Sequence, residues 1–276
     1  MIPHKDECIE ILLEMLNIPL DSADGVFEKF STLPNAKYIK GKNKQERFLY
    51  IPGKRSDRVL LVAHADTFWD EAYGNDKVNQ SIVNDWPILK GENNSIGIGA
   101  DNRAGCAMLY ALKNSGHSIL IMDSEENNKV SHNFLKKNYP QYLKEFNNHS
   151  YMLEIDLPNF GYCSSARIAN KQEFVEFIKQ GLFLKTNPVM EKLGTDVTVL
   201  CKNICGINIS CGYYDQHKGN ETLNGEQWCT TLYYLNNFLK KPQKKFGISY
   251  FKKMTCFIKA KFNRLLNILK RITGHK

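Results

Sequence analysis

Residues 58–66 read RVLLVAHAD, and this stretch decides the fold. An almost continuous apolar run of this length, without polar alternation, is typical of a strand that is buried on both faces of a parallel sheet. The run ends on His64, and Asp66 follows two residues later, so both side chains point to the same side of an extended chain. This ending is either a local capping feature or part of a metal site.

Strands of the same kind alternate with helical patterns along the chain. Apolar runs predict strands at 58–64, 117–123, 151–156 and 206–210, and apolar residues at helical spacing predict helices at 101–115, 170–180 and 225–240. This alternation indicates an α/β fold with three layers, α/β/α, around a largely parallel mixed central sheet. In such sheets functional residues gather just beyond the carboxyl ends of the strands.

The composition is that of a globular protein. The chain has 276 residues, of which 42% are apolar and 24% charged, which is ample for a hydrophobic core. No apolar run reaches the roughly 18–20 residues that a membrane span needs. The N-terminal stretch 1–16 has acids inside its apolar pattern, so it predicts an amphipathic first helix rather than a secretory signal, and we expect a cytoplasmic protein.

The net charge of +8 is concentrated at the C-terminus. Twelve of the 37 Lys and Arg residues lie in 240–276, which has no Asp or Glu, so the rest of the chain has 25 basic and 29 acidic residues. Within the segment 241–276, residues 249–272 place apolar side chains at helical spacing, which predicts a basic amphipathic tail. Such a helix either docks on the mildly acidic body or lies peripherally on an anionic membrane surface. A protein partner is a further alternative, and nucleic acid is not favoured.

Residue types that bind metals stand at the predicted strand ends and at one glycine-rich turn. These residues are His64, Asp101 in GIGADNRAG, Glu126 after HSILIMD, Asp156 at the end of YMLEID, and His217 in GYYDQH. Two imidazoles and three carboxylates suffice for two divalent metals that share one bridging carboxylate.

Two neighbouring acids fit supporting roles at such a site. Glu125 would lie beside the metals without binding them, and a free carboxylate there can carry a proton from a metal-bound water to the leaving group. The carboxylate of Asp66 can accept a hydrogen bond from the second ring nitrogen of His64 and so fix the tautomer of that imidazole.

The ordered motifs HAD, GADNRAG, SEEN, EID and GYYDQH closely resemble those of the dinuclear zinc peptidases of clan MH, over about residues 45–240. That clan includes aminopeptidases and related carboxypeptidases and deacylases. The resemblance implies a zinc-exopeptidase (phosphorylase/hydrolase-like) fold and two Zn²⁺ ions, with Co²⁺ or Mn²⁺ as alternatives. It also implies a role for each residue: His64 and Asp156 bind one metal, Glu126 and His217 the other, Asp101 bridges both, Asp66 orients His64, and Glu125 is the general base.

The chain departs from the family pattern at one position and lacks room for an inserted domain. The family turn often reads Asp-Asp where this chain has Asp101-Asn102, and the resemblance implies a cis peptide there. Only 35, 30 and 61 residues separate Asp66 from Asp101, Glu126 from Asp156, and Asp156 from His217. We therefore expect a single catalytic domain at 1–240 without a lid domain, which favours the compact aminopeptidase type.

Simpler explanations exist for each feature alone. A strand-end histidine is usually packed or capping, and an acid pair such as Glu125-Glu126 suits a helix N-terminus. The glycines near Asp101 lack the spacing of a phosphate loop. Tyr213 and Tyr214 either reach the substrate or form a packed aromatic pair, and the eight cysteines, without a CxxC pair, are typical of small buried residues in a reducing compartment.

The ordered set of ligands favours the metal site over these explanations. The sequence therefore predicts a metal-dependent hydrolase of peptide or acyl-amide bonds, and an aminopeptidase in particular. Its substrates would be peptides or acyl-amino acids. The alternatives are a deacylase or carboxypeptidase of the same clan, and a non-catalytic, membrane-tethered scaffold with this fold.

Overall fold

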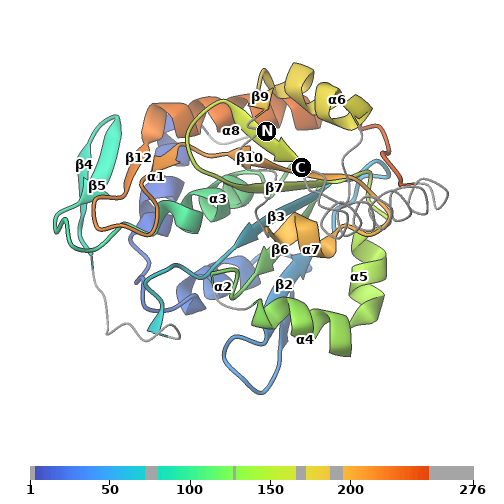
Figure 1. Ribbon diagram of the computed structural model, residues 1–276, viewed down its shortest axis with the longest axis horizontal. Helices are drawn as coiled ribbons and strands as arrows, with labels where there is room; N and C mark the ends of the chain where they lie inside the picture. The colour runs from blue at the N-terminus through green and yellow to red at the C-terminus, as the bar shows by residue number, and fades with distance from the viewer. Residues whose placement is uncertain (1–3, 72–79, 127–128, 166–171, 187–194, 249–276) are drawn as a thin grey trace, which may run out of the picture.

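The computed structural model describes residues 4–71, 80–126, 129–165, 172–186 and 195–248. Its main sheet contains eight strands: β1 (Lys37–Lys40), β2 (Arg47–Ile51), β3 (Leu60–His64), β6 (Ser118–Met122), β7 (Met152–Leu157), β8 (Tyr162–Ser165), β9 (Lys185–Thr186) and β10 (Gly206–Ser210). Their order across the sheet is β1-β2-β6-β3-β7-β10-β8-β9 (Figure 1). The four central strands, β6, β3, β7 and β10, run parallel to one another.

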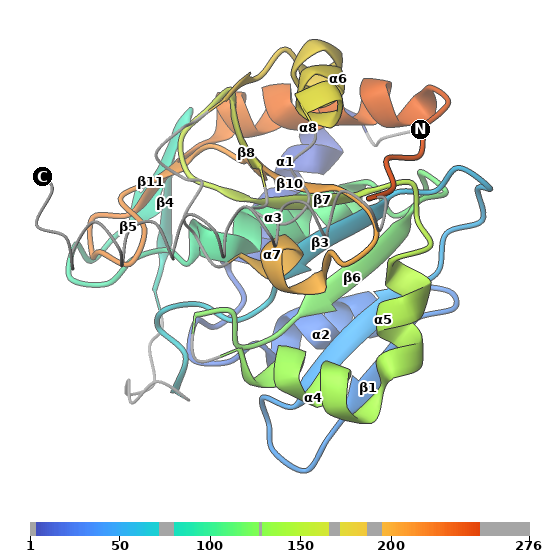
Figure 2. The same ribbon diagram turned by 45° about the vertical axis from the view of Figure 1, so that its right-hand side comes forward.

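Helices cover both faces of this sheet (Figures 1 and 2). They are α1 (Lys5–Leu16), α2 (Asp24–Ser31), α3 (Ala100–Ala111), α4 (Val130–Asn138), α5 (Pro140–Phe146), α6 (Gln172–Leu182), α7 (Asp196–Leu200) and α8 (Gly225–Lys240). On one face α3 packs on β3 and β7, with α1 and α8 beside it and α6 against α8. On the other face α7 packs on the same central strands, and α4 contacts β2. Burial on both faces explains why the central strands are mostly apolar.

A second, four-stranded sheet lies at one end of the molecule, on the left in Figure 1. It consists of β4 (Ile82–Asp85), β5 (Ile88–Gly91), β11 (Tyr213–Tyr214) and β12 (Thr222–Asn224), in the order β11-β12-β5-β4. Its strands are antiparallel and two to four residues long, too short for a clear alternating pattern in the sequence. The sheet matters for the site because the hairpin between β11 and β12 carries His217.

The predicted fold class is confirmed. The four predicted strands are β3, β6, β7 and β10, and the predicted helices are α3, α6, α8 and the N-terminal α1, each within a few residues of its expected bounds. Six of the seven described cysteines are buried, as expected for small apolar residues. Among the described residues, no helix is both long enough and apolar enough to cross a bilayer.

The structure describes only the first part of the predicted basic tail. Residues 241–248 lie against the body, where the Phe246 ring is buried and its main chain pairs with Ser150 and Cys205. The predicted amphipathic helix at 249–272 lies outside the described residues.

Candidate metal centre

Three of the predicted ligands meet at the carboxyl ends of β3 and β7. His64 is the last residue of β3, and Asp156 lies near the end of the neighbouring strand β7. The Nε2 atom of His64 lies 3.2 Å from Asp101 Oδ1 and 3.2 Å from Asp156 Oδ1. All three residues are buried, and their ligand atoms lie within 4.8 Å of one another. One imidazole nitrogen and two carboxylate oxygens at this spacing are suited to a divalent cation.

A second group of ligands shares Asp101 with the first. His217 Nε2 lies 3.2 Å from Asp101 Oδ2 and 2.7 Å from Glu126 Oε1, again with all ligand atoms within 4.8 Å. The two oxygens of Asp101 therefore face different groups, Oδ1 towards His64 and Oδ2 towards His217. A carboxylate placed in this way can bridge two metal ions.

Glu221 holds the backbone of Asp101 in place at the start of α3. The buried carboxylate of Glu221 accepts hydrogen bonds from the backbone N–H groups of Gly99 (2.8 Å) and Asp101 (3.0 Å). Gly99 adopts φ of 62°, a left-handed conformation that glycine reaches without strain. The Asp101-Asn102 peptide is cis, as the family resemblance implied.

Asp66 connects the end of β3 with the segment that follows β6 and carries Glu126. Its Oδ1 and Oδ2 atoms accept hydrogen bonds from the backbone N–H groups of Glu125 (3.2 Å) and Glu126 (3.1 Å). The Nδ1 atom of His64 lies 3.1 Å from the Asp66 carbonyl oxygen and 3.4 Å from its Oδ1. A carbonyl can only accept, so Nδ1 carries the proton and Nε2 offers its lone pair to the site.

The environment of Asp156 explains the position of Tyr213. The backbone N–H of Asp156 donates to Asn208 Oδ1 at 2.9 Å, and the buried hydroxyl of Tyr213 donates to the Asp156 carbonyl at 3.0 Å. The hydroxyl of Tyr214 donates to Gln227 Oε1 at 2.6 Å. The two tyrosines that the sequence suggested as substrate contacts thus use their hydroxyls within the protein.

Glu125 lies next to the ligands and pairs with a lysine. Its Oε1 lies 2.8 Å from the Nζ atom of Lys129, and the two side chains are 18% and 25% exposed. It belongs to neither group of candidate ligands. Burial raises the pKa of Glu125 above its ordinary value.

An exposed aromatic ring covers the second ligand group. Phe68, which follows β3, stacks on the imidazole of His217 with ring centroids 4.9 Å apart and planes within 13°. The Phe68 residue is 41% exposed. His217 itself has φ of 62° in the hairpin between β11 and β12. The stack restrains the orientation of the His217 imidazole, which is otherwise exposed.

Three carboxyl groups lie close together at the site, and burial disfavours the ionised form of each. Burial raises the pKa of Glu126 to about 7 and lifts that of Asp156 well above its usual range. Burial acts in the same direction on Asp101, but hydrogen bonds with His217 and His64 outweigh it and hold the pKa of Asp101 low. The same contacts, with Asp101 and then Glu126, raise the pKa of His217 to about 10. Buried acids need positive charge to ionise, and the donor set is therefore suited to divalent cations.

Sequence reasoning missed three residues that support this site. Glu221, Asn208 and Lys129 each touch a predicted site residue, and none belongs to a recognisable motif. Only the alternation of residues along the predicted strand 206–210 could have placed Asn208 on one face of the sheet.

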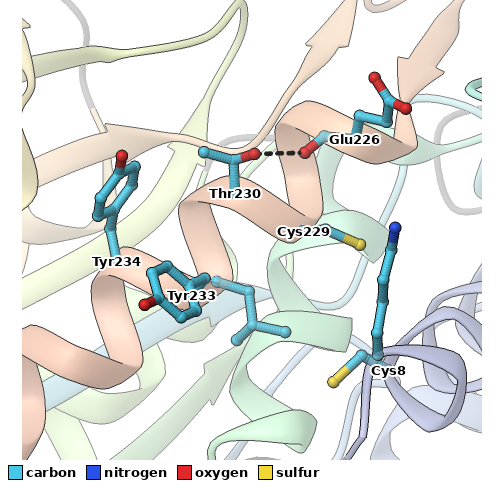
Figure 3. Close-up of a pocket in the computed structure, with 8 residues that line it drawn as sticks. Cys8, Glu226, Cys229, Thr230, Tyr233 and Tyr234 are labelled. Carbon is cyan, nitrogen blue, oxygen red and sulfur yellow. Dashed lines mark hydrogen bonds between the residues drawn. The ribbon is translucent and has the colours of Figure 1, made fainter.

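The structure also contains a cavity of about 620 Å³ at α1 and α8 (Figure 3). It is lined by Lys5, Cys8, Glu226, Cys229, Thr230, Leu232, Tyr233 and Tyr234. None of the candidate ligands lines this cavity.

No protein-family model matches the chain, and no curated protein matches it. Solved structures do. The aminopeptidase PepT from Bacillus cereus matches with a TM-score of 0.64 at 11% identity, over 86% of this chain and 98% of that one. A tripeptidase from Staphylococcus aureus gives a TM-score of 0.62 at 12% identity, over 87% and 98% of the two chains.

An aminopeptidase from the archaeon Desulfurococcus kamchatkensis gives a TM-score of 0.58 at 11% identity, over 87% of this chain and 96% of that one. At such low identity the likeness concerns the fold. The chain therefore shares the α/β fold of these aminopeptidases and this tripeptidase.

Proposed function

We propose that this protein is a two-metal peptidase that removes N-terminal residues from peptides. The observation that supports this most directly is the position of Asp101 between two ligand groups, with a non-ligand acid, Glu125, beside them. The likeness to aminopeptidases and a tripeptidase adds support for peptide substrates.

The proposed cofactor is a pair of zinc ions, with cobalt or manganese as substitutes. His64, Asp101 and Asp156 would hold one ion, and Asp101, Glu126 and His217 the other. When bound, such a pair lowers the pKa of a water molecule and polarises the scissile carbonyl.

Glu125 is the proposed proton carrier. It takes a proton from the attacking water and delivers it to the nitrogen of the leaving amine, as the C–O bond forms and the C–N bond breaks. Asp66 binds the backbone N–H groups of both Glu125 and Glu126. The proposed base and one proposed ligand are therefore held in a fixed position relative to each other. The buried first ligand group keeps bulk water from His64 and Asp156.

The first test measures metal content and activity together. The protein and its His217→Ala and Glu125→Ala variants would be purified without added metal and analysed for bound elements. We expect about two zinc ions per chain, and one or fewer in His217→Ala. Glu125→Ala should keep the metal and lose activity. A protein that binds neither zinc nor cobalt would overturn the proposal and favour the scaffold alternative.

The choice of substrate then separates the classes of hydrolase. Three versions of one tripeptide would be compared: free, N-acetylated and C-amidated. An aminopeptidase accepts the amide and rejects the acetylated peptide. The reverse preference would indicate a carboxypeptidase, and release of acetate a deacylase.

We also propose, from the sequence alone, that residues 249–272 bind an anionic membrane surface and make the protein a peripheral one in the cytoplasm. The full chain should sediment with phosphatidylserine vesicles, and a chain that ends at residue 248 should not. Equal sedimentation of both would overturn this proposal.

A further inference from the structure

We infer that Lys129 is the positioning residue for Glu125. This inference rests on the proposed function, because it gives Glu125 the role of general base. The contact that carries it is the 2.8 Å approach of Lys129 Nζ to Glu125 Oε1, between side chains that are 25% and 18% exposed. A partly buried ion pair orients its members more firmly than an exposed one.

Lys129 reaches this position in a backbone conformation that is unfavourable for a lysine. Lys129 has φ of 51°, a left-handed conformation that a residue with a side chain adopts only when its surroundings impose it. Its N–H donates to the Ser124 carbonyl at 3.1 Å, and the N–H of Ser131 donates to Ser124 Oγ at 2.9 Å. These bonds hold Lys129 and the start of α4 against Ser124, the residue before Glu125.

A buried acid, Asp196, acts electrostatically on Lys129. Asp196, the first residue of α7, is fully buried, and its Oδ1 lies 2.7 Å from Nε2 of His132, which is also buried. The backbone N–H of Asp196 donates to Glu154 Oε1 at 2.8 Å, which fixes α7 on β7.

Lys129 therefore carries its charge between two carboxylates. Burial opposes that charge, but Asp196 and Glu125 outweigh it and keep the pKa of Lys129 above its ordinary value. Both carboxylates favour the charged form of the lysine, and its Nζ atom holds Oε1 of Glu125. The second oxygen, Oε2, is then the one that can accept the proton from water.

Kinetics of single variants test the role. In Lys129→Met we expect kcat to fall about 10–100-fold, with KM and metal content close to those of the wild type. Lys129→Arg should recover part of kcat, since the charge is restored. Lys137→Met is the matched control, because Lys137 is exposed on α4, the helix that Lys129 precedes. An unchanged kcat in Lys129→Met would overturn the inference.

A second measurement does not depend on activity. The melting temperatures of metal-free Glu125→Gln, Lys129→Met and the double variant form a double-mutant cycle. We expect each single change to lower the Tm by about 2 °C and the double change to lower it no further. Additive shifts would overturn the inference. A wild type that hydrolyses no peptide would overturn the proposed function, and the cycle would still decide whether Lys129 holds Glu125.

Discussion

The carboxylate of Asp66 accepts the backbone N–H of Glu126 at 3.1 Å, so a residue just after β3 fixes a candidate ligand that follows β6. The other oxygen of Asp66 accepts the N–H of Glu125. One buried side chain thus aligns the proposed base and a proposed ligand with the strand that carries His64. A carboxylate suits this task because each of its oxygens is an acceptor.

Replacing Asp66 with asparagine should disrupt this alignment. The amide NH₂ of asparagine would face one of the two backbone N–H groups and leave it without an acceptor in a buried place. We expect a loss of about 2 kcal/mol in the free energy of unfolding and a fall of about 10–100-fold in kcat. Urea denaturation and steady-state kinetics would measure both. Wild-type stability in Asp66→Asn would mean that the two hydrogen bonds do not hold the loop.

Removing single ligands should separate a bridging residue from a terminal one. Because Asp101 offers an oxygen to each ligand group, Asp101→Ala should lose both metal ions, whereas His217→Ala should lose only one. Elemental analysis after dialysis would count the ions. Equal metal loss in the two variants would contradict a bridging role for Asp101.

The ring of Phe68 should matter for the second metal more than for the fold. Phe68→Ala removes the ring that stacks on His217, so we expect affinity for one of the two metals to fall about 10-fold, as when a supporting neighbour of a ligand is removed. Titration with Co²⁺, followed by its absorption spectrum, would measure the two affinities. Tyr233→Ala is a control, since Tyr233 is 57% exposed and lies at the cavity on α8. If both variants titrate alike, the stack does not support the site.

His149 should make the fold sensitive to acid. It is buried, its Nδ1 lies 3.0 Å from the Phe146 carbonyl, and its Nε2 accepts from the hydroxyl of Ser118 at 2.8 Å. Burial lowers its pKa from 6.5 to about 4. Because the folded pKa lies below the unfolded one, this contribution to stability is present above pH 6.5 and is lost as the pH falls towards 4.

The expected effect of His149 is a free energy of unfolding about 2 kcal/mol lower at pH 5 than at pH 7. Denaturation of the metal-free protein at the two pH values would measure it. His149→Gln does not titrate, so its loss between pH 7 and pH 5 should be smaller by the same amount. The same loss in both proteins would show that another group is responsible.

The central part of the fold could be predicted because its strands are buried on both faces. The runs that become β3 and β6 are apolar at every position except their ends, and such runs stand out from the rest of the chain. The small sheet could not be predicted, since β11 and β12 are only two and three residues long and β12 pairs with β5 from another part of the chain. Glu221, which supports the site, also comes from a distant part of the chain: it accepts from the backbone N–H of Asp101, 120 positions away.

The sequence by itself determined the layered α/β architecture and the order of the motifs that hold His64, Asp101, Glu126, Asp156 and His217. Both are local properties, of hydrophobic runs and of the residues at their ends. Only the tertiary structure decided which oxygen of Asp101 faces which histidine and that Glu221 holds the backbone of Asp101. Distances of about 3 Å between segments far apart in the chain arise only when the sheet and its helices have packed together.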